Sequence, residues 1–283
     1  MPKLPHPEPQ SLRRDPLPLR GRTALVTGAS RRGGIGYAVA RRLAAYGASV
    51  YLHHHMSHDA QKPWGAEPGG IDAVVEGVRA ALADPDAVVL HGPADLSDPA
   101  APAALVAKAA GELGGRLDVL VANHALSGYD GTLDDIDVRH LDAHWAVDVR
   151  SVVLMVKEYA RLRAALPAST PGGRVVTMTS GQDIAGGMPW ELAYGLAKGA
   201  LASVTRSLST HLAELAVTIN TVNPGPVDTD YMEGDDYRAV ADRFPSGRWG
   251  MPDDPARLIA WLATDEAEWI TGEVINSEGG FKR

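Results

Sequence analysis

The chain contains 283 residues, of which 45% are hydrophobic and 22% are charged, and its formal net charge is −8. This composition is typical of a globular protein and excludes global disorder, and the length allows one large core. The absence of cysteine excludes disulfides, cysteine-bound metals and thiol nucleophiles. The acidic balance argues against nucleic acid as a partner, and no apolar run approaches the roughly 18 residues of a membrane span.

The first 18 residues are rich in proline and contain no apolar stretch of secretory-signal length. We therefore predict a poorly ordered arm over 1–18, followed by one folded domain over 19–283, in a cytoplasmic protein. An alternative for the arm is packing on a neighbouring subunit.

From Thr23 onward, short apolar runs alternate with longer segments of helical periodicity. Continuous apolar runs such as 119–121 are typical of parallel strands buried on both faces. The pattern predicts an α/β fold with a doubly wound parallel sheet of about seven strands, helices on both faces, and ligands at the carboxyl ends of the strands. We expect strands at 23–27, 49–53, 87–91, 118–121, 174–178, 218–222 and 273–276. We expect helices over 35–46, 71–83, 100–113, 141–162, 194–215 and 255–263.

A glycine-rich turn over 27–36 joins the first strand to the first helix. Glycine lets the backbone approach a pyrophosphate, and the free N–H groups of a helix N-terminus attract the anion. In this context the turn predicts a nucleotide site, although a glycine-rich turn without a ligand is the alternative. The cofactor contacts expected in this half are Gly28, Ser30, Arg31, Arg32, Gly34, Ile35, Gly36 and His54.

The second strand ends at His53–His55, where sites that prefer NAD carry an acidic residue for the ribose 2′-hydroxyl. Arg31 and Arg32 lie in the glycine-rich turn, so the charge pattern favours a 2′-phosphate and hence NADP(H) over NAD(H). The histidines also suggest a metal site, but alternate strand residues point to opposite faces and no carboxylate pattern completes a ligand set. We expect no metal.

Tyr194 and Lys198 stand four residues apart on one face of a predicted helix. A nearby ammonium lowers the pKa of a phenol and prepares it for proton transfer. Ser180 ends an earlier strand, where its hydroxyl can hold a carbonyl oxygen beside that phenol. Alone, the tyrosine–lysine pair is weak evidence for a catalytic site. It becomes strong evidence because it follows a nucleotide-binding turn and a serine at a strand end.

In these motifs the chain resembles the short-chain dehydrogenase/reductase family, and most of all its 3-oxoacyl-[acyl-carrier-protein] reductases. The resemblance extends from about Gly21 to Gly280 and includes Asp95-Leu96, Asn123–Ala125, Asn223–Pro226 and Ile270–Gly272. It implies a single-domain Rossmann fold that transfers a hydride between a nicotinamide and a carbonyl group. It also implies a homo-oligomer, a tetramer or dimer, with the helices at 141–162 and 194–215 at an interface.

The resemblance further implies roles for individual residues. Tyr194 is the general acid in reduction, Ser180 polarises the carbonyl, and Lys198 holds the nicotinamide ribose and lowers the pKa of Tyr194. The remaining cofactor contacts are Asp95, Leu96, Asn123, His124, Pro224, Gly225, Val227 and Thr229. The substrate contacts are Met188, Trp190 and Tyr231. Tyr231 begins a polar segment over 231–249, which is expected to form a mobile lid.

Three positions depart from the pattern of the family. The glycine-rich turn is longer than usual, and Ala122 replaces one cofactor-supporting amide. Asp148 stands where the family has a catalytic asparagine. An ionised carboxylate only accepts hydrogen bonds, so Asp148 either strengthens the Lys198 ammonium electrostatically or stays protonated and mimics the amide.

The sequence therefore predicts NADP(H)-dependent reduction of a ketone, either a 3-oxoacyl thioester or a polyketide-like carbonyl, to a secondary alcohol. One alternative is an enoyl-thioester reductase, a group that separates its active tyrosine and lysine by six residues rather than three. A second alternative is an NADP(H)-binding sensor or scaffold without turnover, which the aspartate at 148 motivates.

Overall fold

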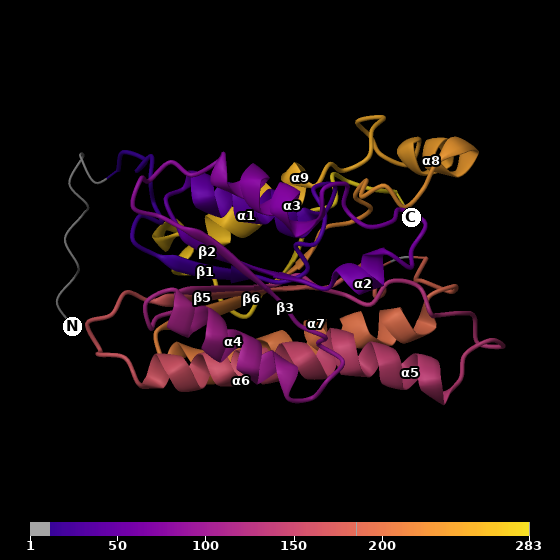
Figure 1. The fold of residues 1–283 in the computed structure, drawn as a ribbon. Helices are drawn as coiled ribbons and strands as arrows, with labels where there is room; N and C mark the ends of the chain where they lie inside the picture. Colours follow the sequence, from indigo (N-terminus) through magenta and orange to yellow (C-terminus); the bar gives the residue numbers. More distant parts are fainter. Residues whose placement is uncertain (1–11, 185, 283) are drawn as a thin grey trace.

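The computed structural model describes residues 12–184 and 186–282. It confirms the predicted doubly wound sheet, because its seven parallel strands lie in the order β3-β2-β1-β4-β5-β6-β7 (Figure 1). The order reverses between β1 and β4, and ligands bind at such a switch point in this fold class. The strands are β1 (Thr23–Val26), β2 (Ser49–His54), β3 (Val89–Pro93), β4 (Val119–Ala122), β5 (Gly173–Met178), β6 (Val217–Asn223) and β7 (Val274–Asn276).

Helices cover both faces of the sheet (Figure 1). On one face lie α1 (Ile35–Ala45), α3 (Gly70–Arg79) and α9 (Asp253–Leu262). The other face carries α4 (Ala101–Glu112), α5 (Val138–His144), α6 (Ser151–Ala164) and α7 (Leu192–Ala213). Two short helices, α2 (Met56–Asp59) and α8 (Gly234–Ala241), and a 3₁₀ turn at Asp265–Ala267 complete the fold.

Alternation along the strands builds two cores. In β1, Val26 packs in the cluster with α1 and α9, whereas Leu25 packs in the cluster with α4 and α6. In β4, Val121 likewise packs in the first cluster and Leu120 in the second. Successive strand residues point to opposite faces, so a continuous apolar run fills both cores at once.

Apart from shifts of a few residues at the ends of several elements, the described elements differ from the expected ones mainly as follows. The helix expected over 141–162 is interrupted by a π-helical segment, Trp145–Arg150, between α5 and α6. Strand β3 begins two residues later than expected and ends at Pro93, because the ladder with β2 continues through His53 and His54. The short helices α2 and α8 were not expected at all; α8 lies within the predicted lid.

The N-terminal arm is described from Leu12 onward, and residues 1–11 lie outside the described residues. Leu19 is buried, and its N–H donates to the carbonyl oxygen of Tyr46 at 2.9 Å. The chain therefore enters the sheet from a contact with the end of α1.

Candidate active site

The turn between β1 and α1 lies very close to the loop after β4. Gly28 has a φ of +69°, and a Cβ there would lie 2.8 Å from the Cα of His124. At Gly36 a Cβ would lie 2.6 Å from the carbonyl oxygen of Gly28. Asn123 holds this turn, since its Nδ2 donates to the carbonyl oxygen of Thr27 at 2.9 Å. Both positions therefore require glycine, and the turn is fixed at the N-terminus of α1, where an anion is favoured.

A cavity of about 400 Å³ opens beside this turn, at the carboxyl ends of the strands. We refer to it as the nucleotide cavity. Its position at the switch point is the one at which doubly wound sheets bind dinucleotides. The expected cofactor residues that line it are Gly28, Ser30, Arg31, Gly34, Asp95, Leu96, Asn123 and His124.

Two expected cofactor residues point elsewhere. The Nε of Arg32 lies 2.6 Å from Oε1 of Glu67, and Arg32 borders a separate surface hollow. The Nε2 of His54 lies 3.3 Å from Nδ1 of His91. Alternation along β2 explains the second difference, because the cavity is lined by the neighbours of His54 on either side, His53 and His55.

The segment after β2 supplies three lining residues that the sequence patterns did not identify, His58, Asp59 and Trp64. Two of them contact Arg31, whose guanidinium lies 3.2 Å from Asp59 and 5.1 Å from the centre of the Trp64 ring. The same guanidinium donates to the carbonyl oxygen of Thr229 at 3.0 Å. Arg31 is thus held in the cavity by an ion pair, a cation–π contact and a hydrogen bond.

His53 is held as a neutral ring at the base of this cavity. The N–H of Gly28 donates to Nδ1 at 3.2 Å, and Nε2 lies 3.0 Å from the carbonyl oxygen of Ala94. One ring nitrogen therefore accepts while the other donates, which is the pattern of a neutral imidazole. Burial lowers the pKa of His53 to about 4.

A second cavity, of about 370 Å³, shares the wall at 125–127 with the nucleotide cavity. Ser180, after β5, and Tyr194, in the first turn of α7, both line it. Lys198 lies one turn further along α7, almost fully buried, with Nζ 5.3 Å from the centre of the Tyr194 ring. Nζ donates to the carbonyl oxygen of Met178 at 3.3 Å. The fold thus brings three of the predicted catalytic side chains together, and we refer to this second cavity as the substrate cavity.

The charges around Tyr194 act against the expected change in its pKa. Burial raises the pKa of Tyr194 above its ordinary value, and the charges of Asp148 and Glu191 raise it further. A hydrogen bond with the Ser180 side chain acts in the opposite direction. Burial also lowers the pKa of Lys198, which Asp148 opposes. The expectation of a lowered pKa for Tyr194 is therefore wrong for this arrangement, because burial is the largest cause and the neighbouring carboxyl groups act in the same direction.

Asp148 lies in the π-helical segment and is fully buried. Its Oδ1 accepts from the N–H of Leu126 at 2.8 Å, and its Oδ2 lies 2.7 Å from Nδ1 of His144. The Nε2 of His144 faces the carbonyl oxygen of Gly128 at 3.1 Å and Oδ2 of Asp130 at 3.8 Å. Neither His144 nor Asp130 was identified from the sequence, although His144 and Asp148 have the i, i+4 spacing of a helical pair.

Asp130 also fixes the start of α7. Its Oδ1 accepts from the N–H of Ala193 at 2.9 Å, and its Oδ2 accepts from the N–H of Tyr194 at 2.7 Å. These are free N–H groups of the first helical turn, which a carboxylate satisfies well. The backbone of Tyr194 is therefore anchored to the loop after β4.

The walls of the substrate cavity contain most of the expected contacts. Trp190 is an exception, because it is 74% exposed and does not line this cavity. Glu191 lines the cavity instead, and burial and then the charge of Asp130 raise its pKa. The expected residues present are Ile35, Met188, Pro224, Gly225, Val227, Thr229 and Tyr231.

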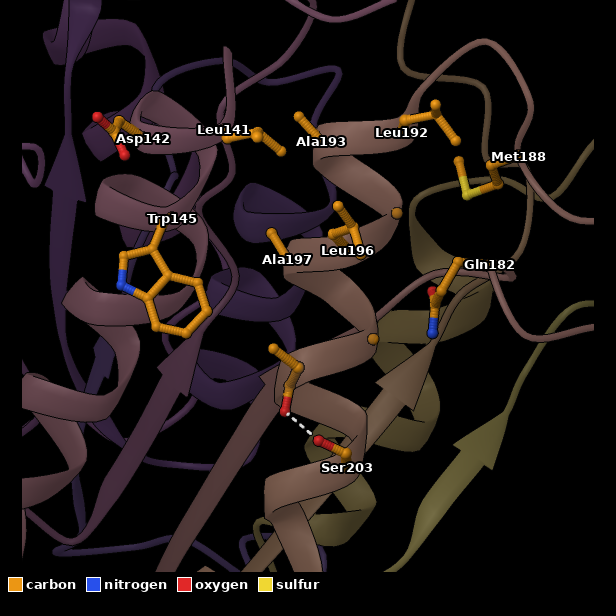
Figure 2. A pocket seen from close by; sticks show the side chains of 13 residues that line it. Leu141, Asp142, Trp145, Gln182, Met188, Leu192, Ala193, Leu196, Ala197 and Ser203 are labelled. Atoms are coloured by element: carbon orange, nitrogen blue, oxygen red, sulfur yellow. Dashed lines mark hydrogen bonds between the residues drawn. The ribbon is translucent and has the colours of Figure 1, made fainter. Parts of the chain in front are cut away.

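A third hollow lies on the outer side of α7, away from the sheet (Figure 2). Its volume is about 780 Å³, and α5, the π-helical segment and the loop at 182–188 border it. Trp145 and Leu196 are 55% and 65% exposed there. Figure 2 shows Leu141 and Trp145 on one side of α7 and Met188 on the other. We refer to this apolar hollow as the outer groove.

The comparisons with known proteins agree with this fold. A family model described as Enoyl-(Acyl carrier protein) reductase matches residues 28–282. The chain is 41% identical over 260 residues to an uncharacterised oxidoreductase, YjdA, of Bacillus subtilis strain 168, covering 92% of this chain and 96% of that protein.

Two solved structures are also similar. The short-chain dehydrogenase/reductase of Serratia marcescens BCRC 10948 has a TM-score of 0.78 and 31% identity, over 94% of this chain and 100% of that one. A 3-oxoacyl-(acyl-carrier-protein) reductase of Agrobacterium tumefaciens C58 with NADP bound has a TM-score of 0.76 and 30% identity, over 96% and 99%. The fold and site define a nicotinamide-dependent oxidoreductase. The chain belongs to the short-chain dehydrogenase/reductase family.

Over the described ranges 12–184 and 186–282, no helix is long and apolar enough to cross a membrane. Within the same ranges, no three histidine, aspartate or glutamate side chains gather closely enough to hold a metal ion.

Proposed function

We propose that the protein is an NADP(H)-dependent ketone reductase in which Tyr194 protonates the substrate oxygen. The observation that supports this most is the meeting of Ser180 and Tyr194 at one cavity, with Lys198 behind them and the nucleotide cavity adjoining. Ser180 would donate to the substrate carbonyl oxygen and hold it beside the phenol. Tyr194, with its pKa raised, stays protonated at neutral pH and is ready to donate.

The residues of the nucleotide cavity fit a nicotinamide dinucleotide. The glycine-rich turn and the N-terminus of α1 suit the pyrophosphate. Lys198 is buried with a single described hydrogen-bond partner, so its ammonium has donors free for the nicotinamide ribose. When bound, the dinucleotide would supply the hydride. Pro224, Gly225 and Thr229, along the substrate cavity, would hold the nicotinamide end.

We propose that NADP(H) is preferred over NAD(H), and that Arg31 rather than Arg32 is responsible. Arg31 reaches the cavity beside Ser30 and His55, and these groups suit a 2′-phosphate. Asp59 offsets part of this charge, since it pairs with Arg31 at 3.2 Å. On binding, the phosphate would take the place of Asp59 as the anionic partner.

The charge of the substrate cavity favours a neutral ketone. Two carboxyl groups, of Asp130 and Glu191, line it, and none of the described residues along it is lysine or arginine. A substrate with a carboxylate or phosphate near its carbonyl would meet repulsion there. We therefore favour a neutral, polyketide-like ketone over a substrate with an anionic group close to the reacting carbon.

A second candidate is reduction of an enoyl thioester, which the description of the matching family model favours. The spacing of Tyr194 and Lys198 supports carbonyl reduction instead, because the residue seven before Lys198 is Glu191 and the residue seven after Tyr194 is Leu201.

A panel of substrates tests these functions. The purified protein is mixed with NADPH or NADH and with neutral ketones, keto acids or an enoyl thioester, and nucleotide oxidation and product are measured. We expect secondary alcohol from neutral ketones with NADPH, and slower reaction with keto acids. Reduction of the enoyl thioester alone would establish the second candidate. Tight NADPH binding with no turnover of any substrate in the panel would favour the alternative of an NADP(H)-binding sensor or scaffold.

We also propose that the protein is a homo-oligomer whose subunits meet at the outer groove (Figure 2). Trp145 and Leu196 are large and exposed, and small residues on α7, such as Ala200, allow a second helix to approach closely. Light scattering in solution measures the assembly directly, and a monomer at micromolar concentration would contradict the proposal.

A further inference from the structure

Two hydrogen bonds determine which protons His144 can hold. Its Nδ1 faces Oδ2 of Asp148 at 2.7 Å, and its Nε2 faces the carbonyl oxygen of Gly128 at 3.1 Å. Both partners are acceptors, and the ring is 1% exposed, so water cannot replace either of them. A neutral ring with an ionised Asp148 would leave two acceptors facing each other. The pair must therefore hold one extra proton, on Nδ1 or on Oδ2.

The surrounding charges select between these two positions. Asp130 lies 3.8 Å from Nε2 and favours a positive ring. Lys198 interacts with Asp148 and favours an ionised carboxylate. Oδ1 of Asp148 also accepts from the N–H of Leu126, which again suits the carboxylate. All three contacts stabilise an ion pair with the proton on Nδ1.

This pair connects two parts of the site that are distant in sequence. Asp148 belongs to the π-helical segment, whereas Gly128 and Asp130 belong to the loop after β4. Asp130 in turn accepts from the N–H of Tyr194 at 2.7 Å, and the rings of His144 and Tyr194 meet edge to face at 6.0 Å. His144 is therefore linked to Tyr194 in two ways, through Asp130 and by direct contact of the rings.

We infer that His144 is a buried imidazolium, paired with Asp148 and Asp130, that positions Tyr194 for proton transfer. This rests on the proposed function of Tyr194. It also explains the aspartate at 148, since the donor that an asparagine amide would provide at that point is replaced by the N–H of His144. His144 is a positioning residue, because it acts through Asp130 and the start of α7.

The pair predicts a dependence on pH. Burial alone would lower the pKa of His144, but the hydrogen bond and charge of Asp148, followed by the charge of Asp130, raise it above its ordinary value. The other titratable groups that face the pair are Tyr194, Glu191, Lys198 and His58. Because the pKa is raised, the charged pair is complete at low pH and is lost as the pH rises through that value.

Nitrogen-15 NMR of the histidine rings tests the charge state without any substrate. In the wild-type protein we expect one buried ring with protons on both nitrogens at pH 7, assigned by its loss in His144→Gln. In Asp148→Asn the amide donates to Nδ1, so that ring should become neutral, with its proton on Nε2. A wild-type ring that lacks the Nδ1 proton at pH 7 would overturn the inference.

Kinetics and hydrogen exchange test the positioning role. We expect His144→Gln to lower kcat about tenfold with unchanged NADPH binding, and the double variant with Asp148→Asn to recover to within about threefold, since no buried carboxylate is then left uncompensated. His140→Gln, on the same helix, is the control. Should His144→Gln not fold, the pH profile of Asp148→Asn is the test. We expect the kcat of the wild type to fall as the pH rises and the charged pair is lost, and Asp148→Asn to remove that fall.

Amide exchange at Ala193 and Tyr194 gives a readout that needs no turnover. It should be faster in His144→Gln than in the wild type. Unchanged exchange, kcat and pH profile in these variants would overturn the positioning role. A protein that reduces no carbonyl but shows the doubly protonated ring and the faster exchange would contradict the proposed function, and would leave standing the charged pair and its hold on the position of Tyr194.

Discussion

The two halves of the site each contain a buried histidine. One of the two rings is neutral, and the other carries a positive charge. His53, in the nucleotide half, meets a donor at Nδ1 and an acceptor at Nε2, and is neutral. His144, in the catalytic half, meets acceptors at both nitrogens. Their exposures, 2% and 1%, are nearly the same. Burial alone therefore does not decide the charge of a histidine; its hydrogen-bond partners do.

The difference suits the two tasks of the site. In the nucleotide half, His53 holds the N–H of Gly28 and so fixes the glycine-rich turn without adding charge. In the catalytic half, the extra proton of His144 balances the carboxyl groups of Asp148 and Asp130 beside Tyr194. One region is built for binding and the other for holding protons.

The largest expected effect comes from removing the proposed proton donor of the catalytic half. Tyr194→Phe should lower kcat by roughly 10²–10⁴-fold, the usual contribution of general acid catalysis. NADPH affinity should remain within about twofold, because the phenol lies at the substrate cavity. Steady-state rates and a fluorescence titration of NADPH measure the two quantities. A variant that turns over within tenfold of the parent would remove Tyr194 from the mechanism.

The neutral state of His53 predicts a loss of stability in acid. Its pKa of about 4 lies below the unfolded value of 6.5, so the stability it provides is present above pH 6.5 and is lost as the pH falls toward 4. By pH 5 the loss from His53 should reach about 2 kcal/mol. Urea unfolding at pH 7.5 and pH 5 measures this. His53→Gln, which keeps a donor and an acceptor, should flatten the dependence, and an equal slope in that variant would contradict the neutral ring.

The preference for NADPH can be tested by removing the positive charge of Arg31 from the nucleotide half. Arg31→Ala should weaken NADPH binding about tenfold or more, since hydrogen bonds to charged groups contribute about 1.5–3 kcal/mol. NADH binding should change little. Arg32→Ala is the matched control, because Arg32 pairs with Glu67 away from the cavity. Fluorescence titrations give the four constants, and a larger effect for Arg32 would reverse the assignment.

The smallest effect on turnover is expected from a substitution in the outer groove, which lies on the surface of the catalytic half. Trp145→Asp should reduce the size of the assembly in light scattering and lower kcat only a few fold. Val88→Asp, at an exposed apolar residue before β3, is the control. An assembly unchanged by Trp145→Asp would place the interface elsewhere.

The features that depend on local spacing were predictable from the sequence. The parallel sheet and the meeting of Tyr194, Lys198 and Ser180 follow from apolar runs, an i, i+4 pair and a strand end. Each of these is decided within a few residues of chain. The doubly wound order then brings the strand ends together.

The features that depend on distant partners were not predictable. Arg31 and Arg32 are adjacent, and only the fold of the segment at 56–64 brings one into the cavity. The role of Asp148 depends on a donor from His144, at i, i+4 spacing, and also on the loop at 126–130. No spacing rule connects that loop to Asp148. The π-helical segment, Trp145–Arg150, which positions Asp148, also has no simple sequence signature.

The central claim is that the bound nucleotide reduces a neutral ketone with Tyr194 as acid, and a single-turnover experiment tests it most directly. Protein in excess over NADPH is mixed rapidly with a neutral ketone, and NADPH loss and alcohol are measured together. We expect one equivalent of secondary alcohol for each NADPH oxidised, at a rate that Tyr194→Phe lowers by roughly 10²-fold or more. Bound NADPH that persists with every ketone, or that is consumed equally fast in Tyr194→Phe, would contradict it.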